Sequence, residues 1–440
     1  MSDLPVVVIG AGPQGLAAAA HLRERGLVPL VLELGDGPGA AVAEWGHVRL
    51  FSPWPELMDR AAVDILQPSG WVAPTEGYPT GAEWVESYLA PLGAALAQWI
   101  RYDTRVTGVS RKGRDRLVDA ERGDQTFTVH VVNGAGHEAL IEARAVIDAS
   151  GTWRTPSPAG ADGLPALGEI ACADKLRYGV PDRHDPEAFA GKHTVVLGAG
   201  DSALNAILEL DRIAQDHAGT TITWALRRAT TENTFGGGAD DQLERRGALG
   251  VRAREAVEAG RVDIVTGFRT SEIRRVGDQV AVVAEDGRAL PAADTVVALT
   301  GFRPDLTFLS ELRLDLDPTL EAPRRVAAEV DPNIHSCGSV QATGAADLAH
   351  SDEPNFYMVG MKSYGRAPTF LAMTGYEQVR SVVAMLAGDV ESAARVELVL
   401  PDTGVCGGSG LYDEPDAASE GGCCGSAPEL VQLGAGPVVS

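Results

Sequence analysis

The chain has 440 residues, of which 45% are hydrophobic, so it can bury the cores of two or three domains and is not disordered as a whole. Its formal net charge of −24 repels the phosphates of nucleic acids and of anionic membranes, which excludes both as expected partners. Five cysteines are too few for a disulfide framework, and no apolar run approaches the roughly 20 residues of a membrane span, so we expect a cytoplasmic protein.

The first motif is a glycine turn that follows a strand. Residues 6–9 (VVVI) form a short apolar run, as in a central parallel strand that is buried on both faces. The glycines that follow have the G-x-G-x-x-G spacing, in which the first permits a tight turn, the second lets backbone approach a pyrophosphate, and the third lets a helix pack closely on the strand. The residues of this turn are Gly10, Gly12, Pro13, Gln14 and Gly15.

An acidic residue completes this pattern. A second apolar strand, residues 29–32, ends at Glu33, which lies 23 residues after Gly10 and has the spacing of a carboxylate that accepts hydrogen bonds from ribose hydroxyls. Because strand, turn, helix, strand and acid occur in this order, we predict a dinucleotide site. The alternative is a glycine turn in an ordinary βαβ unit.

The pattern recurs near the middle of the chain. A strand at residues 195–197 leads into a second turn, in which a small alanine takes the third glycine position. The next strand, residues 221–225, is followed by two arginines in place of an acid, and guanidinium groups can pair with a 2′-phosphate. We therefore predict a nicotinamide site that prefers NADPH to NADH, the alternative being arginines that only face solvent. The predicted binding residues are Gly198, Gly200, Asp201, Ser202, Ala203, Arg227 and Arg228.

Two further strand ends indicate where the chain passes between domains. Residues 141–150 read as a strand that runs into Ser150 and Gly151, and residues 294–299 read as a strand that runs into Thr300 and Gly301. A first site that ends in an acid and a second that ends in arginines fit FAD first and NADPH second. The strand end at Ser150 and Gly151 looks like one that passes close to a bound flavin nucleotide, and the turn at Thr300 and Gly301 repeats this design. They predict an α/β fold of two Rossmann-like, three-layer nucleotide-binding domains, with the NADPH domain inserted into the FAD domain. The predicted segments are 1–160 and 295–395 for FAD, 161–294 for NADPH, and 396–440 for a flexible tail.

Four side chains are candidates for contact with the reacting groups. Arg49 and Trp54 follow the first βαβ unit and could bind an anion and form an aromatic wall, although a partly buried aromatic loop explains them equally well. Lys362 and Tyr364 precede an apolar helix expected from about residue 369 to 387 and could form an anion platform, the alternative being a solvated loop. No residue is singled out as an acid or base, because a flavin carries the hard chemistry.

The tail concentrates three of the five cysteines, namely Cys406, Cys423 and Cys424. Thiolates are soft ligands, and three of them on a glycine-rich segment could wrap a thiophilic ion or metalloid. Incidental thiols on an unstructured tail are an equal alternative. Neither nucleotide domain contains a C-x-x-C or C-x₄-C pair, so an orthodox dithiol reductase is not expected.

The two glycine turns and the Ser-Gly and Thr-Gly turns resemble those of the flavoprotein superfamily with two dinucleotide-binding domains, which includes flavin-containing monooxygenases and thioredoxin reductase. The segments GHVRLFSPW (46–54), TGFRPD (300–305) and VGMKSYGRAPTFLAMTGYEQVRS (359–381) are similar to flavin-binding monooxygenases encoded in bacterial arsenic-resistance gene clusters. The monooxygenase fingerprint F-x-G-x-x-x-H-x-x-x-W/Y is not legible, its nearest echo being Tyr178, Gly179 and His184.

This resemblance implies an oxidoreductase in which NADPH reduces FAD, followed by transfer of oxygen from O₂ to a small soft nucleophile, with trivalent arsenicals as the leading substrate. One alternative is a reductase that passes electrons to the tail thiols or to a partner protein. A redox or metalloid sensor without turnover is the other. A homodimer is compatible with the sequence, which does not fix the oligomeric state.

Overall fold

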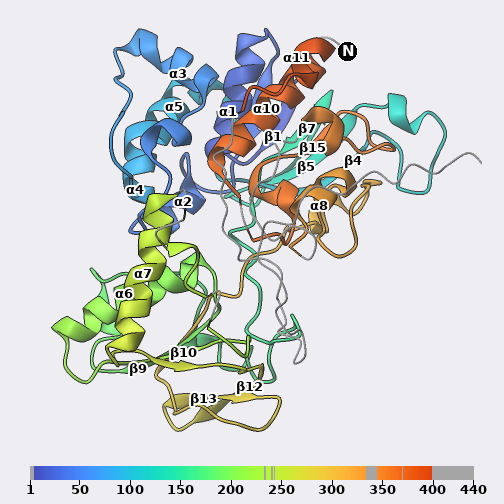
Figure 1. Cartoon of the computed structure of the whole chain (residues 1–440). Helices are drawn as coiled ribbons and strands as arrows, with labels where there is room; N and C mark the ends of the chain where they lie inside the picture. Colours follow the sequence, from blue (N-terminus) through green and yellow to red (C-terminus); the bar gives the residue numbers. More distant parts are fainter. Residues whose placement is uncertain are drawn as a thin grey trace, which may run out of the picture.

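The computed structural model describes residues 4–231, 234–238, 241, 243–332, 344–368 and 370–398. Figure 1 shows two lobes, each built on its own parallel sheet, with helices α6 and α7 and strands β9 and β10 in one lobe and helices α1 and α10 in the other. Among the helices in these ranges, none combines the length and the hydrophobicity that a bilayer span requires.

The first sheet has five parallel strands in the order β15-β7-β1-β2-β3. Its central strand confirms the buried apolar run expected at residues 6–9, because Val6, Val7 and Val8 are fully inaccessible to solvent. The register aligns Ile9 with Leu32 on one side and with Asp148 on the other, so the three strands end together. The strands are β1 (Val6–Ile9), β2 (Pro29–Leu32), β3 (Ile100–Arg101), β7 (Ala145–Asp148) and β15 (Phe356–Met358).

Helices cover one face of this sheet and an antiparallel sheet covers the other. On the helical face, α1 (Pro13–Glu24) packs against α10 (Ala372–Leu386). On the opposite face, side chains of β4 and β5 share a core with Val7, Ile9 and Phe356 of the parallel sheet. The antiparallel strands are β4 (Thr104–Arg111), β5 (Phe127–Asn133) and β6 (Glu138–Ala143), and the shorter helices of this lobe are α2 (Ala40–Glu44), α3 (Arg60–Leu66), α4 (Gly81–Trp84), α5 (Ala90–Ala95), α8 (Arg324–Val330), α9 (Ala345–Leu348) and α11 (Val390–Ala394).

The second lobe repeats this three-layer plan. Its parallel sheet has the order β11-β10-β9-β14-β8, with α6 (Asp201–Asp216) and α7 (Glu244–Glu258) packed on one face and the hairpin of β12 (Thr270–Val276) and β13 (Gln279–Ala284) on the other. The strands are β8 (Leu176–Arg177), β9 (His193–Leu197), β10 (Thr221–Ala225), β11 (Asp263–Val265) and β14 (Thr295–Ala298).

Three predicted boundaries are wrong in detail. Residues 295–298 were expected to begin the return to the first domain, but β14 pairs with β8 and β9 of the second sheet, so the chain leaves that domain only after this strand. The single strand expected at 141–150 is two strands, because Arg144 separates β6 of the antiparallel sheet from β7 of the parallel one. The last long helix begins at Ala372 rather than near residue 369, and Leu371 is its N-cap.

A buried histidine of α1 contacts the residue that caps the N-terminus of α3. His21 is 2% exposed, its Nε2 lies 3.0 Å from Asp59 Oδ2, and its Nδ1 lies 3.4 Å from Glu24 Oε2. Burial alone lowers the pKa of His21, but the carboxylates of Asp59 and Glu24 outweigh that effect and raise it from 6.5 to about 9. The folded state therefore holds a protonated imidazolium at neutral pH.

We expect the contacts of His21 with Asp59 and Glu24 to make the free energy of unfolding depend on pH. Because the folded pKa of His21 is raised, its contribution is complete below the unfolded value of 6.5 and is lost as the pH rises to about 9. A shift of this size corresponds to about 3 kcal/mol. Urea unfolding at pH 6, 7.5 and 9 measures it, with His21→Gln as the control, whose stability should fall less over this range. Equal pH profiles for the two proteins would contradict the assignment.

Candidate functional site

The first glycine turn joins β1 to α1 and leaves a space above its second glycine. Gly10 has φ +99°, and a Cβ on Gly15 would lie 1.9 Å from the carbonyl oxygen of Gly10, so helix and turn are in direct contact there. A Cβ on Gly12 would meet no atom within 4 Å. The turn is thus packed tightly below and open above, as a backbone cradle for a pyrophosphate requires.

Glu33, Ser150 and Gly151 surround this turn at the ends of the neighbouring strands. The Glu33 carboxylate accepts hydrogen bonds from the backbone N–H of Ala11 at 2.5 Å and from that of Gly35 at 2.7 Å. On the other side, Ser150 Oγ donates to Asp148 Oδ1 at 2.6 Å. Glu33 is therefore fixed at the edge of the cradle, where the sequence pattern places the acid of a dinucleotide site.

A further segment, which sequence analysis did not assign to this cradle, closes its far side. Gln14, in the first turn of α1, donates through Nε2 to the carbonyl oxygen of Ala372 at 3.4 Å. Its side chain also packs against Gly360 and Gly375, where added Cβ atoms would lie 3.1 Å and 2.6 Å from Gln14 Cγ. The start of α10 therefore lies beside the first glycine turn, although some 360 residues separate them in the sequence.

Lys362 and Tyr364 do not form the expected open anion platform. Lys362 is fully buried, and its Nζ donates to Asp148 Oδ2 at 2.6 Å and to Ser150 Oγ at 3.1 Å. Tyr364 is 1% exposed and packs edge-on against Phe370, and burial raises the pKa of its hydroxyl. The carboxylate of Asp148 thus neutralises the lysine, and this ion pair holds the end of β7 to the segment after β15.

Arg49 and Trp54 lie apart from each other and differ in exposure. Trp54 is 7% exposed and belongs to the core under α1, so the expected aromatic wall at this position is wrong. Arg49 is solvent-accessible, and its Nη1 donates to the carbonyl oxygen of Tyr78 at 2.5 Å and lies 3.3 Å from Glu83 Oε2. The Arg49 guanidinium is therefore exposed to solvent and can reach a bound anion.

The second glycine turn joins β9 to α6 and has the same form. Gly198 has φ +124°, and a Cβ there would lie 2.1 Å from the carbonyl oxygen of Leu299, whereas a Cβ on Gly200 would meet no atom within 4 Å. The small Ala203 is fully buried, Ser202 is exposed, and Asp201 begins the helix. Burial raises the pKa of Asp201, with Arg246 opposing and Asp241 adding to the rise.

The remaining predicted residues follow β10 and β14. Arg227 comes directly after β10 and Leu226, and its Nη1 donates to the carbonyl oxygen of Ala161 at 3.1 Å; Arg228 is partly buried beside it. Thr300 Oγ1 donates to the carbonyl oxygen of Ser157 at 2.8 Å, and the carbonyl oxygen of Gly301 accepts from the backbone N–H of Ser157 at 2.8 Å. Thr300 and Gly301 thus join the two segments that cross between the lobes.

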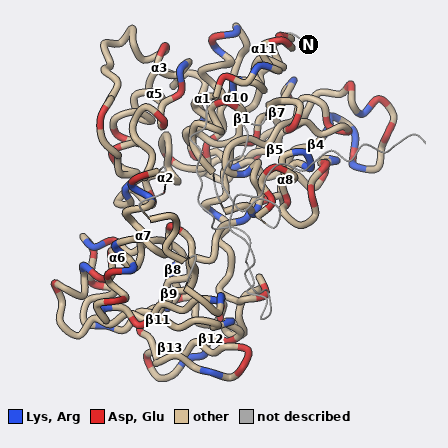
Figure 2. The backbone as a smooth tube through the Cα atoms, viewed as in Figure 1, with Lys and Arg blue, Asp and Glu red and all other residues tan. Residues whose placement is uncertain are grey.

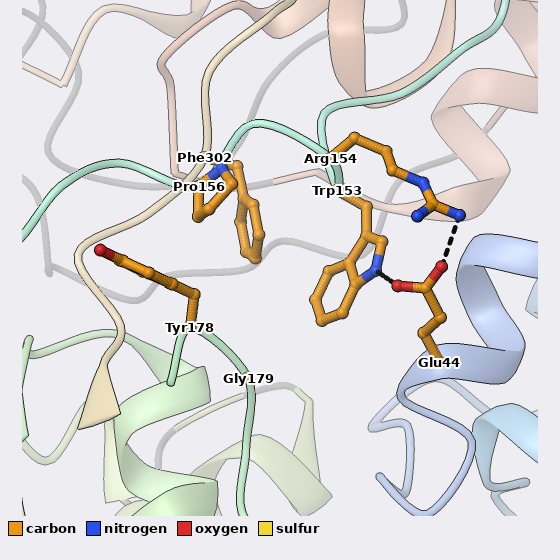
Figure 3. Close-up of a pocket in the computed structure, with 7 residues that line it drawn as sticks. All are labelled: Glu44, Trp153, Arg154, Pro156, Tyr178, Gly179 and Phe302. Carbon is orange, nitrogen blue, oxygen red and sulfur yellow. Dashed lines mark hydrogen bonds and ion pairs between the residues drawn. The ribbon is translucent and has the colours of Figure 1, made fainter. Parts of the chain in front are cut away.

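A cavity of about 290 Å³ lies beside these crossing segments (Figure 3). Glu44, at the end of α2, accepts from Trp153 Nε1 at 2.7 Å and pairs with Arg154 Nη2 at 2.5 Å. The ring of Trp153 lies 5.2 Å from that of Phe302. Tyr178 and Gly179, the nearest echo of the monooxygenase fingerprint, line its opposite side, whereas His184 does not. Aromatic rings and one ion pair therefore line this interlobe space.

Within the described ranges, no group of three potential metal-ligating side chains occurs. Cys172 is buried and is the one cysteine that these ranges contain. The proposed tail ligands Cys406, Cys423 and Cys424, like Cys337, lie outside the described residues.

The geometry of two glycine turns on two parallel sheets agrees with a family model. Residues 7–323 match the model of the pyridine nucleotide-disulphide oxidoreductases. The chain belongs to this family. Its fold class is confirmed, and so are FAD and a nicotinamide dinucleotide, NAD(P)H, as its cofactors. The protein is an FAD-dependent oxidoreductase.

Named relatives and solved structures divide between reductases and monooxygenases. A ferredoxin–NADP reductase of Nocardioides is 27% identical over 72% of this chain and 78% of its own length. Bacillithiol disulfide reductase of Bacillus cereus is 21% identical, with a TM-score of 0.64 over 88% of this chain and 99% of that one. A flavin-containing monooxygenase of Stenotrophomonas maltophilia is 24% identical, with a TM-score of 0.53 over 88% and 99%. The two solved structures support the fold.

Proposed function

We propose that the protein takes a hydride from NADPH at the second glycine turn and passes the electrons to FAD at the first. The observation that supports this proposal is the pair of open cradles at Gly12 and Gly200, each at a helix N-terminus that favours a phosphate. When bound, FAD would accept two electrons as a hydride and could pass them on one at a time or to oxygen. The chain's own residues bind and orient the two dinucleotides: Glu33 beside the first cradle, and Arg227 and Arg228 beside the second.

For the final electron acceptor, we propose a one-electron carrier protein. This choice rests on the curated relatives, among which a ferredoxin–NADP reductase aligns over 72% of the chain. A redox disulfide that includes Cys172, the cysteine in the described ranges, is disfavoured because its side chain is 3% exposed and donates to the carbonyl oxygen of Ile273.

The second candidate is oxygenation of a small soft nucleophile, with trivalent arsenicals as the leading substrate. Its specific support is the resemblance of residues 46–54 and 359–381 to monooxygenases of arsenic-resistance clusters, together with the fold of the Stenotrophomonas monooxygenase. In this case O₂ supplies one oxygen atom to the nucleophile and one to water, and NADPH supplies both electrons.

Anaerobic mixing of the yellow, FAD-loaded protein with NADPH tests the proposed function. We expect the visible flavin absorbance to bleach, and to bleach at least about tenfold more efficiently with NADPH than with NADH because of Arg227 and Arg228. Reoxidation by a ferredoxin would support the carrier, whereas oxygenated product from methylarsenite and O₂ would support the monooxygenase. A colourless protein after reconstitution, or a flavin that NADPH leaves oxidised, would contradict the proposal.

A further inference from the structure

A second cavity, of about 370 Å³, lies between the two lobes and carries an excess of positive charge. The first lobe contributes residues 46–51, together with Thr80 and Ala82, and the second contributes residues 180, 182–184 and side chains of α6 and α7. Figure 2 shows basic positions near α2 and beside α6, in a chain whose net charge is −24. The arginines that line the cavity are Arg49, Arg183, Arg212, Arg245 and Arg252.

Nearby carboxylates neutralise only part of this cluster. Glu209 pairs with both Arg212 and Arg183, whose Nε lies 3.7 Å from Glu209 Oε2. Glu83 pairs with Arg49 at 3.3 Å. Asp182, the other acid in the lining, lies 4.0 Å from the imidazole of His47.

Two arginines of the cluster face the cavity without a carboxylate partner in the described part of the chain. Arg245 lies over the ring of Tyr78, 5.3 Å from its centroid, and Arg252 Nε donates to the carbonyl oxygen of Ala248 at 3.2 Å. Burial lowers the pKa of Arg245, and so do the charges of Arg49 and Arg252. Like charges held together at a partly buried site are unfavourable unless an anion joins them.

We propose that this cavity binds a compact anion with at least two negative charges, carried by carboxylate or phosphate groups. Guanidinium groups match both kinds of oxyanion in bidentate geometry, and the volume admits a small molecule rather than a second dinucleotide. None of the lining residues belongs to either glycine turn or to the Arg227–Arg228 pair, so the cavity has its own set of anion-binding side chains and adjoins the second cradle only through Asn205, which donates to the carbonyl oxygen of Asp201. This inference concerns binding and holds whichever electron acceptor the enzyme uses.

The position of the cavity gives the bound anion a structural effect. Arg49 belongs to the first lobe, whereas Arg245 and Arg252 belong to α7 of the second. An anion that contacts all three replaces their mutual repulsion by attraction and stabilises the arrangement in which α7 lies against residues 46–51. The anion therefore favours this relative placement of the lobes over others.

Isothermal titration of the full-length, FAD-loaded protein with inorganic pyrophosphate and, separately, with citrate tests the proposal. At constant ionic strength we expect saturable binding of one anion per chain by at least one of the two, and the stronger ligand identifies phosphate or carboxylate as the preferred group. Arg245→Gln and Arg252→Gln should each weaken that binding by about tenfold or more. Arg254→Gln is the matched control, because Arg254 lies on the same helix but stacks over Phe235 outside the cavity.

Three results would overturn the proposal. The first is a lack of saturable binding by both anions, and the second is equal affinity in the wild type and in the Arg245 and Arg252 variants. The third is displacement of the anion by 2′,5′-ADP, which would place it in the coenzyme cradle. Because Arg252 is exposed, Arg252→Gln should fold even if Arg245→Gln does not. A protein that binds the anion but is not reduced by NADPH would refute the proposed function alone.

Discussion

Gly12→Ala is expected to leave the apoprotein as stable as the wild type and to weaken FAD binding by at least about 100-fold, or roughly 2.7 kcal/mol. The added methyl group meets no protein atom within 4 Å, so the fold has room for it. It occupies the space through which a pyrophosphate would approach the backbone N–H groups of the turn. Flavin fluorescence titration measures the affinity, and urea unfolding of the apoprotein measures the stability.

Gly15→Ala is the matched control, three residues away in the same turn. Its Cβ would lie 1.9 Å from the carbonyl oxygen of Gly10, so helix α1 must move away from β1. Overpacking of this kind typically costs about 1–3 kcal/mol, and a backbone contact this short places it at the upper end. We therefore expect Gly15→Ala to destabilise the apoprotein itself. Normal FAD affinity in Gly12→Ala, or equal stability losses in both variants, would refute the assignment of this cradle.

The glycine turns illustrate what a sequence can predict. Their residues are contiguous, and the pattern of strand, turn and helix is local, so the spacing alone located β1, β2, β9 and β10 and the open sides of both turns. The local sequence does not predict the buried environment of Lys362. Its partner Asp148 lies 214 residues earlier, and only the pairing of β7 with β15 brings the two together.

The arginine cluster of the basic cavity also depends on contacts between segments that are far apart in the sequence. The sequence places Arg49 beside a predicted cofactor segment, but Arg212 and Arg245 are ordinary charged helix positions when read alone. They become a cluster only when α6 and α7 lie against residues 46–51 of the other lobe. The position of β14 was mispredicted because a strand followed by a Thr-Gly turn looks the same in either domain. The pairing of β14 with β9, about 100 residues earlier in the chain, assigns β14 to the second domain.

A buried ion triad in the first lobe is expected to produce the largest loss of stability from a single side-chain change. Glu353 is fully buried and accepts from Arg111 Nε at 2.8 Å, from Arg122 Nη2 at 2.6 Å and from the backbone N–H of Arg313 at 2.9 Å. Arg111 and Arg122 are themselves 1% and 3% exposed. Burial lowers the pKa of Arg111, and the charge of Glu353 opposes that change.

Glu353→Gln should therefore lower the free energy of unfolding by about 3–5 kcal/mol, because it leaves two buried guanidinium groups without their shared counter-charge. Glu321→Gln is the control: it removes an equivalent carboxylate, but the partner of Glu321 is Arg366, 40% exposed at the surface, where such a pair is worth about 0–1 kcal/mol. Urea unfolding of the two variants at pH 7 makes the comparison. Similar losses in both would mean that burial does not set the strength of the triad, whereas a loss confined to Glu353→Gln would show that this charge holds β4 and the loop before β15 together.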